Sequence, residues 1–455
     1  MNEIRLRNYR CFRDEQKARL APLTLLVGEN STGKTSFLAL VRALWDLGYR
    51  FEMPDFKEEP YDLGSFDEIA HHRGAKGSRA ASFEAGYTAT SVPAQGKGPD
   101  AGKERSFDFV FSRDRNQPSL AKRRVRHGET FIELDLENER TLVGTSKGSW
   151  QCNLGANLHL SLQFDERRVL IPWYFLIDGL LSERRQATNE EDLKWTSTSG
   201  PKLPSKADRQ RLRQLATADP ARRLHGRPYA SAPVRSKPRR TYDPSRLTRD
   251  PEGEAVPMYL ADISHRGQKN WTTLYSALEE FGRTSGLFDE MRVRRLGRTS
   301  SEPFQIQVRK SGTKKLKGPW RNLTDVGYGV SQVLPVITEL LRSDAPSMFL
   351  LQQPEVHLHP SAQAALGTLF CNVAANKKQL IVETHGDHLL DRVRMDVRDQ
   401  TTGLRPEDVS ILFFERGALE VQIHSLRFDA AGNILDEPEG YRRFFLEETN
   451  RSIGL

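Results

Sequence analysis

The chain has few cysteines, no long apolar run and no heptad repeat. Its three cysteines, Cys11, Cys152 and Cys371, lie far apart in 455 residues and show neither a CxxC pair nor a metal-ligand spacing. This argues against a disulfide scaffold and suits a reducing compartment. The longest apolar segment, 169–181, is interrupted by a proline and an aspartate and is too short to span a bilayer.

The chain also lacks the marks of a secreted or fibrous protein. Residues 1–5 are charged and lead directly into a strand-like pattern, so we expect no signal peptide and a cytoplasmic protein. The absence of heptads up to residue 320 predicts that there is no long coiled coil. A net charge of +8 favours contact with a polyanion only weakly over this length.

One motif organises the sequence. Residues 28–35 fit G-x-x-x-x-G-K-[ST], the phosphate-binding P-loop, between an apolar strand pattern and an apolar helical run over 35–47. Lys34 is expected to reach the β- and γ-phosphates, and the Thr35 hydroxyl to hold Mg²⁺. The alternative is a chance glycine turn. The residues expected to contact ATP here are Asn30, Ser31, Thr32, Gly33, Lys34, Thr35 and Ser36.

Composition divides the rest into three stretches. We expect an N-terminal ATPase half over 1–180, a basic Ser/Pro-rich insertion over 181–256, and a C-terminal ATPase half over 257–455. In the first, alternating patterns predict an antiparallel β subdomain. Its strands are expected at 81–88, 107–111, 130–136 and 158–164, and a compact basic cluster occupies 122–127. A separate first strand is expected at 4–12.

The insertion is the least core-like part. A short basic helix is expected at 206–216, and the remainder reads as surface loop. Two interpretations stay open, a flexible insertion and a contact with nucleic acid or a partner.

After residue 257 the pattern returns to α/β. Helices are expected at 271–281, 330–341 and 363–374, strands at 304–308, 348–351, 379–382, 411–414 and 419–423, and a helical end near 438–445.

Three further motifs carry chemistry. In residues 325–332, glycines precede an apolar helical pattern. At the start of such a helix the backbone N–H groups and the Ser331 hydroxyl can approach a phosphate. An apolar strand then ends in Gln-Gln-Pro-Glu, and another ends in Thr-His, whose His385 can position water near a γ-phosphate. His357 and His359 could form a metal pair, although an i, i+2 pair in such a loop is more often structural.

In this order the motifs resemble the ABC-type ATPases of the SMC/RecF/OLD group, over residues 1–90 and 320–400. Their particular forms resemble bacterial ATP-binding proteins related to OLD and to the Septu defence ATPase. The resemblance implies a homodimer in which each P-loop faces the other copy's signature motif. It leaves open a higher assembly of such dimers. The signature residues it implies are Gly327, Gly329, Ser331 and Gln332, and 350–360 corresponds to the Walker B and D-loop region.

Two departures from that family stand out. Gln352 and Gln353 occupy the positions of the usual Walker B acids, and an amide is a poor general base, so hydrolysis is expected to be slow unless Glu355 compensates. The catalytic candidates are therefore Gln352, Gln353, Glu355 and His385, and the Mg²⁺ candidates are Thr35 and Gln352. An engineered Glu→Gln change stays open.

The second departure is that no glutamine lies between residues 36 and 94, where a Q-loop is expected. Four polar residues are available there instead, and the sequence does not choose among them. They are Asp67, Glu68, His71 and His72.

The function expected from this combination is an ATPase that dimerises around ATP and Mg²⁺ and controls an effector in bacterial anti-phage defence. Only 389–455 follow the last motif, without an acidic strand-end cluster, so a nuclease-like effector would be a separate chain. The alternatives are a RecF-like DNA-repair ATPase with DNA on its basic surfaces, and a nucleotide-gated scaffold with little hydrolysis. No membrane partner is expected.

Overall fold

The computed structural model describes most of the chain as two compact units. The described residues are 1–74, 78–90, 104–153, 170, 173, 195–217, 226–244, 248–265, 269–299, 302–311, 318–418 and 420–441. Unit one comprises 1–20, 31–224 and 414–423, and unit two comprises 21–30, 225–413 and 424–455. The strand expected at 158–164 and most of the helical end at 438–445 lie outside the described residues. The three stretches expected from composition stay a prediction.

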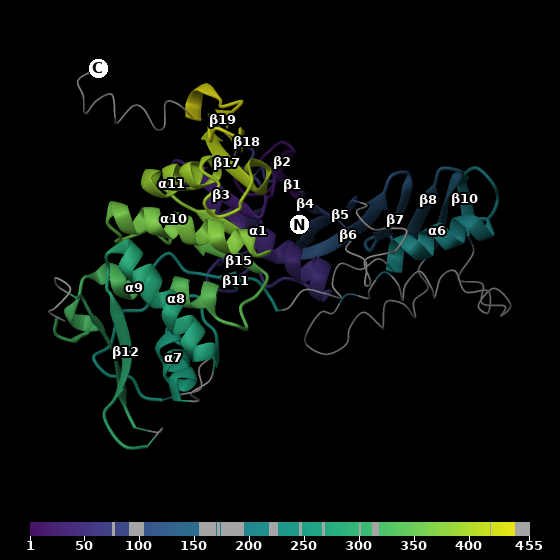
Figure 1. Ribbon diagram of the computed structural model, residues 1–455. Helices are drawn as coiled ribbons and strands as arrows, with labels where there is room; N and C mark the ends of the chain where they lie inside the picture. Colours follow the sequence, from purple (N-terminus) through teal and green to yellow (C-terminus); the bar gives the residue numbers. More distant parts are fainter. Residues whose placement is uncertain are drawn as a thin grey trace. The chain divides into compact units, whose positions relative to one another are not determined.

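Unit one is built on a nine-stranded antiparallel sheet in the order β10-β9-β8-β7-β6-β5-β4-β1-β2. This confirms the antiparallel β subdomain. Its strands are β1 Glu3–Arg7, β2 Gln16–Arg19, β4 Ser82–Thr90, β5 Glu104–Asp114, β6 Gln117–His127, β7 Thr130–Asp135, β8 Arg140–Thr145, β9 Gly148–Asn153 and β10 Thr196–Ser199. Helix α6, Lys206–Thr217, lies against β6, β7 and β8, where a short basic helix is expected (Figure 1).

The basic cluster at 122–127 is part of strand β6. Arg123 and Val125 are buried, whereas Lys122 and Arg124 alternate with them and pair with acidic side chains of β7. The cluster is therefore a half-buried strand whose charges are partly neutralised within the sheet. The density of basic residues hides this period-2 pattern in the sequence.

The first strand is shorter than the expected 4–12. It ends at Arg7, because Asn8 and Arg10 adopt positive φ angles of 54° and 51° and turn the backbone. The turn buries Tyr9 and Phe12 completely. Unit one also contains α1, Lys34–Trp45, with a π-helical turn over Asp46–Arg50, and α2, Phe66–Ile69.

Unit two carries most of a second sheet, in the order β11-β15-β16-β3-β17-β18-β19. Its strands are β3 Leu23–Gly28, β11 Tyr229–Ala230, β15 Met348–Gln352, β16 Gln379–Glu383, β17 Val409–Arg416, β18 Val421–Phe428 and β19 Ile434–Leu435. Strands β11, β15, β16 and β3 run parallel to one another. Parallel strands place their carboxyl ends at one edge, where ligands bind in open α/β sheets. This edge is called the phosphate edge below.

Helices cover one face of this sheet and form the larger core. They are α7 Val256–His265, α8 Lys269–Ser285, α9 Tyr328–Leu341, α10 Pro360–Ala375 and α11 Asp387–Arg398. Helix α8 packs against α9 and α10, and a small antiparallel sheet, β12 Glu290–Arg295, β13 Phe304–Arg309 and β14 Arg321–Asn322, adjoins them (Figure 1). Among the described residues the longest helix has 17 residues, and none is long and apolar enough to cross a membrane.

Part of the segment 229–235, interpreted from sequence as surface loop, is instead buried in unit two: Tyr229, Ala230, Ser231 and Arg235 are buried, whereas Pro233 and Val234 are exposed. Tyr229 and Ala230 form β11 and pair with Phe349 and Leu350 of β15. The pattern Tyr-Ala-Ser-Ala-Pro is too short to show strand periodicity, and its Arg-rich flanks resemble a solvated loop.

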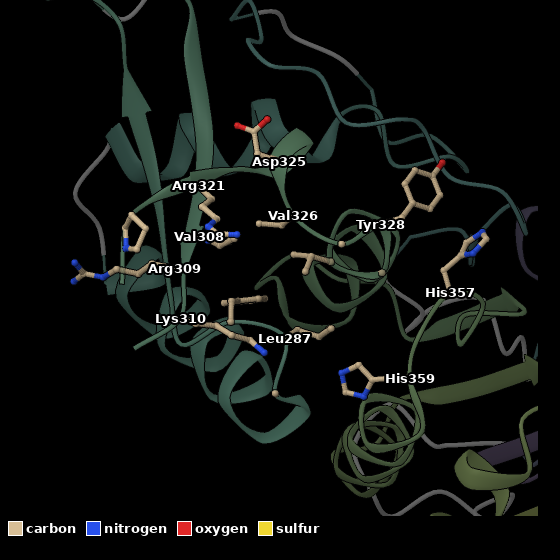
Figure 2. A pocket seen from close by; sticks show the side chains of 16 residues that line it. Leu287, Val308, Arg309, Lys310, Arg321, Asp325, Val326, Tyr328, His357 and His359 are labelled. Atoms are coloured by element: carbon tan, nitrogen blue, oxygen red, sulfur yellow. The ribbon is translucent and has the colours of Figure 1, made fainter. Parts of the chain in front are cut away.

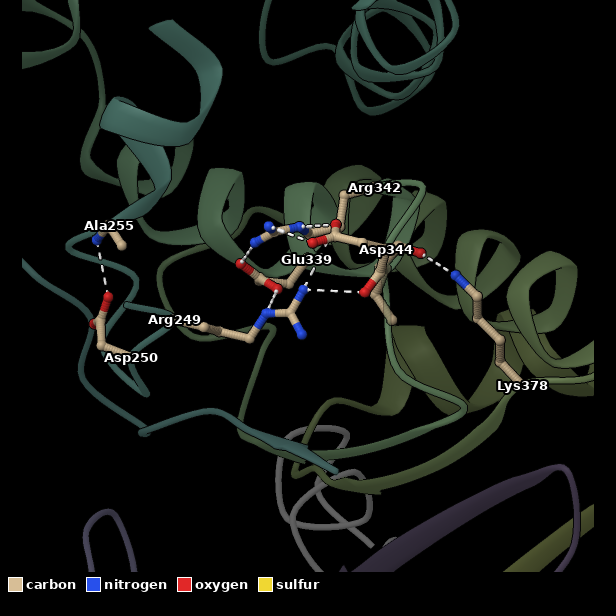
Figure 3. Close-up of polar contacts among 8 residues, drawn as sticks. Arg249, Asp250, Ala255, Glu339, Arg342, Asp344 and Lys378 are labelled. Carbon is tan, nitrogen blue, oxygen red and sulfur yellow. Dashed lines mark hydrogen bonds and ion pairs between the residues drawn. The ribbon is translucent and has the colours of Figure 1, made fainter. Parts of the chain in front are cut away.

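A buried carboxylate anchors the segment after β11 to helix α9. Glu339 pairs with Arg249 Nε at 2.7 Å and with Arg342 Nη1 at 2.7 Å, and both arginines also reach the exposed Asp344 (Figure 3). Two arginines compensate the desolvation of one buried carboxylate, so removing that carboxylate leaves them facing each other.

We expect Glu339→Ala to lower the free energy of unfolding by about 3–5 kcal/mol, because it breaks a buried ion-pair network. Asp344→Ala, which removes an exposed partner of the same two arginines, should cost less than about 1 kcal/mol. Urea unfolding of both variants measures the difference. Equal losses would contradict the structural role of the buried carboxylate.

Candidate functional site

The P-loop begins at the phosphate edge. All six residues of β3 are buried, and the chain turns sharply at Gly28, with φ of 139°. Ser31 has a φ of 61°, and Gly33, at 88°, caps helix α1 in the left-handed region. These angles wind the backbone so that its N–H groups precede a helix N-terminus, which is the geometry that binds a phosphate.

The turn after β1 braces the P-loop within unit one. A Cβ on Gly33 would lie 2.5 Å from Cys11 Sγ and 3.0 Å from the Phe12 ring, so only glycine fits there. The Tyr9 hydroxyl donates to Ser36 O at 2.8 Å, and the Cys11 thiol donates to Thr32 O at 3.5 Å. Sequence reasoning assigned this stretch to a strand and missed its role.

The loop side chains differ in exposure. Lys34 is only 3% exposed and Thr32 is fully buried, whereas Asn30 and Ser31 are exposed. Arg416 Nη2 donates to the Ser31 carbonyl at 3.0 Å. The motif's cationic residue is thus held at the start of α1, and the loop's tip faces solvent.

The glycine-rich motif at 325–332 lies at the start of α9. Gly329 is needed for packing, because a Cβ there would lie 2.6 Å from the His357 carbonyl oxygen. Gly327 differs, since its φ of −56° is ordinary and no atom of the described part of the chain lies within 4 Å of its added Cβ. The buried Ser331 hydroxyl donates to Tyr328 O at 2.8 Å, inside the first turn. Gly327 therefore marks an open approach to the α9 N-terminus.

A cavity of about 690 Å³ opens beside this helix start (Figure 2). Its lining includes the apolar Leu287 and Val308, and in Figure 2 Lys310 and Arg321 extend toward its middle. Among the described lining residues one is acidic, Asp325, and it is paired with Arg240. The cavity is therefore electropositive and suits an anionic group.

Strand β15 ends in the two glutamines. The Gln352 side chain donates through Nε2 to Ser231 O at 3.2 Å, and its backbone N–H donates to Ser231 Oγ at 3.1 Å. Gln353 turns the chain with a positive φ of 40°. Arg235, which is 2% exposed, donates through Nη2 to the carbonyls of both glutamines at 3.1 and 3.2 Å.

Arg235 also connects this strand end to the glycine-rich motif. Its backbone N–H donates to Gln332 Oε1 at 3.2 Å, and Gln332 Nε2 donates back to its carbonyl at 3.4 Å. Burial lowers the pKa of Arg235, opposed by the nearby Tyr229 and Glu355. Arg235 could not be recognised from the sequence, because its segment contains many arginines and no local signal distinguishes Arg235 from the others.

The structure brings Glu355 and the Thr-His motif together. Glu355 Oε1 accepts hydrogen bonds from Thr384 Oγ1 and from the His385 backbone N–H, both at 2.8 Å. Its other oxygen, Oε2, is buried and has no hydrogen-bond partner among the described residues. Burial raises the pKa of this carboxyl. A carboxylate with one oxygen fixed and one available is suited to accept a proton.

The histidines of the loop after β15 have structural roles. His357 has a φ of 68° and its ring packs edge-on against Tyr328 at 5.1 Å. His359 Nδ1 accepts from the Ala362 N–H and caps α10. Among the described residues no group of three or more His, Cys, Asp or Glu side chains is placed to hold a metal.

The four residues available for a Q-loop all make local contacts within unit one. Glu68 accepts from Ser65 in a capping box, and Asp67 pairs with Arg113. The Nδ1–H of His71 donates to Arg10 O at 2.8 Å, and His72 Nδ1 accepts from Gly74 N–H at 3.1 Å. These contacts explain the residues by packing and leave the Q-loop role unassigned.

The chain was compared with curated proteins, solved structures and family models. No curated protein matches the chain. Among solved structures, the chain is similar to an SmcHead bound to the C-winged helix domain of ScpA (10% identity, 94% of this chain and 98% of that chain covered, TM-score 0.45). It is also similar to the Smc head domain of Pyrococcus furiosus bound to the C-terminal domain of ScpA (12%, 94% and 96%, 0.43) and to the SMC head domain of Thermotoga maritima (12%, 93% and 98%, 0.34).

A family model matches residues 23–391, from the strand before the P-loop to the helix after the Thr-His motif. The family is described as "AAA domain, putative AbiEii toxin, Type IV TA system". The match covers most of the chain and includes every motif of the phosphate edge. The chain therefore belongs to this family of P-loop ATPase domains.

Proposed function

We propose that the protein binds ATP and Mg²⁺ between two copies of itself and, in this state, controls a separate nuclease-like effector in anti-phage defence. The observation that carries the dimer is Gly327. Its conformation is open to any residue, and among the described residues no atom lies within 4 Å of a Cβ placed on it. A glycine at such a position is explained by something that approaches from outside, and the P-loop-bound nucleotide of a second copy has the right charge for the adjoining cavity.

Two features support slow hydrolysis, and a third supplies a base that still permits it. The two glutamines at the end of β15 are poor bases, and the amide of Gln352 donates to Ser231. Glu355 offers a carboxylate with a raised pKa beside His385. A slow ATPase suits a switch, because the ATP-bound dimer persists long enough to control a partner.

The family's description supports the link to defence, since it names a toxin of a toxin–antitoxin system. The RecF-like alternative depends on basic surfaces. In the expected basic cluster, however, Arg123 is buried and Lys122 and Arg124 pair with acidic residues of β7. That cluster therefore offers little free charge to DNA, although other basic residues remain exposed.

Sedimentation or light scattering of the purified chain with a non-hydrolysable ATP analogue tests the dimer. We expect the analogue to convert the wild type into a particle of twice the chain mass. Gly327→Glu should abolish this conversion, because a carboxylate would face the phosphates of the other copy, while ATP binding to the P-loop is retained.

Gly327→Ala is the matched control. It adds one uncharged methyl group, so it should reduce analogue-induced dimerisation much less than Gly327→Glu does. Dimerisation of Gly327→Glu at wild-type analogue concentrations would contradict the proposed interface. Co-purification with products of neighbouring genes, with and without ATP, then tests the effector. ATP-independent recovery of all partners would contradict control by the nucleotide.

A further inference from the structure

The missing Walker B acid has a candidate replacement on the neighbouring strand. P-loop NTPases hold Mg²⁺ with the P-loop hydroxyl and an acid at the end of the Walker B strand. Here Gln352 stands at that strand end, and its amide is directed to Ser231 beside β11. The next strand, β16, ends in Glu383, which follows the apolar residues 380–382.

Strand register places Glu383 beside Gln352. The two residues are Cα partners across β15 and β16, and Glu383 is also the partner of Leu26 on β3. Paired residues of parallel strands project from the same face of a sheet. The preceding residues Leu351 and Val382 belong to the helix-covered core, so the two polar side chains lie on the opposite face.

Glu383 is also one strand nearer to the P-loop strand. The sheet order is β15-β16-β3, and the ladder continues past β16 through a bond from Thr384 N–H to Leu26 O at 3.1 Å. The carboxylate therefore lies at the phosphate edge, next to the strand from which Gly28 starts the P-loop. It is 5% exposed, and a buried carboxylate is retained where a cation or donors compensate its charge.

We propose that Glu383 supplies the protein carboxylate for Mg²⁺ in this chain, so that the metal-binding acid has moved from β15 to the adjacent strand. This rests on the proposed binding of ATP at the P-loop. The donor chemistry fits, because Mg²⁺ prefers carboxylate oxygen and is usually held by one or two protein oxygens with phosphates and waters supplying the rest. A three-residue protein cluster is therefore not required.

The test measures how strongly Mg²⁺ improves the binding of a non-hydrolysable ATP analogue. Calorimetry of the full chain is performed in Mg²⁺ and in EDTA, and the ratio of the two affinities is the metal increment. We expect Glu383→Gln to reduce this increment roughly 10- to 100-fold while the affinity in EDTA stays near that of the wild type. A wild-type increment in the folded variant would overturn the proposal.

Two further variants make the result specific. The double variant Gln352→Asp/Glu383→Gln returns a carboxylate to the same face of the sheet, one strand away, and should regain the metal increment. A folded double variant that lacks the increment would count against the proposal. Asp344→Ala removes an exposed carboxylate that precedes β15, at the opposite end of that strand from Gln352, and should keep the increment. Failure of the wild type to bind the analogue in either buffer would instead overturn the proposed function itself.

Discussion

Lys34→Ala is expected to weaken ATP binding roughly 10- to 100-fold, the loss typical of removing a charged hydrogen-bonding group. Lys34 is the first residue of α1 and is 3% exposed, so its ammonium is held in place before the nucleotide arrives. The P-loop motif directs this charge to the β- and γ-phosphates, which no neutral side chain can replace. Calorimetric titration with ATP measures the effect.

Lys378→Ala is a matched control for this experiment. Lys378 is also a partly buried lysine, and it donates to the Leu340 carbonyl at 2.7 Å, outside the P-loop (Figure 3). Its loss should lower stability slightly and leave ATP affinity unchanged. If both variants bound ATP as the wild type does, the P-loop would have no role in binding and the assignment would be wrong.

Glu355→Gln is expected to slow ATP hydrolysis about 100-fold or more, within the range attributed to a positioned general base. The amide still accepts hydrogen bonds from Thr384 and from the His385 N–H, so the geometry of the Thr-His motif should be retained. What it loses is the ability of Oε2 to take a proton. Phosphate release measured under saturating ATP, with unchanged ATP affinity, separates the two effects.

The pH dependence of hydrolysis gives an independent reading of the same carboxylate. Burial raises its pKa above the ordinary value of about 4.3. A base acts when deprotonated, so wild-type turnover should rise as pH increases through this raised pKa, and the glutamine variant should lack the rise. An identical profile in both proteins would exclude Glu355 as the base.

The same shift predicts how stability changes. The stability from a carboxyl with a raised pKa is present below its ordinary pKa and is lost as pH rises through the raised value. The variant has no carboxyl to ionise at this position, so it should lack this loss. The free energy of unfolding of the wild type should therefore fall relative to that of Glu355→Gln as pH rises through the raised pKa, which chemical denaturation at a series of pH values can check.

Much of the nucleotide-binding half was predictable, because its elements combine local motifs with clear periodicity. The P-loop follows from eight contiguous residues, and the apolar runs before Gln352 and Thr384 predict buried strands that β15 and β16 confirm. Helix α9 begins at Tyr328, next to its glycines, as expected. In each case the sequence signal and the structural element occupy the same short stretch.

The features that sequence reasoning missed depend on contacts between distant residues. Arg235 is 117 positions from Gln352, and only the pairing of a two-residue strand places them together. Glu383 gains its meaning from register with Gln352 on another strand, which periodicity along one strand cannot reveal. Cys11 beneath Gly33 is likewise a consequence of a turn formed by positive φ angles.

The buried arginine has a consequence for cooperativity between two copies. Its backbone holds the side chain of Gln332, and its guanidinium holds the carbonyls after β15, so the helix start and the strand end are joined by one extended segment. In the proposed dimer, a nucleotide bound by a second copy at the start of α9 would therefore also act on the end of β15. Linkage makes such coupling reciprocal for binding, so a defect in the segment is expected to lower the Hill coefficient of ATP binding.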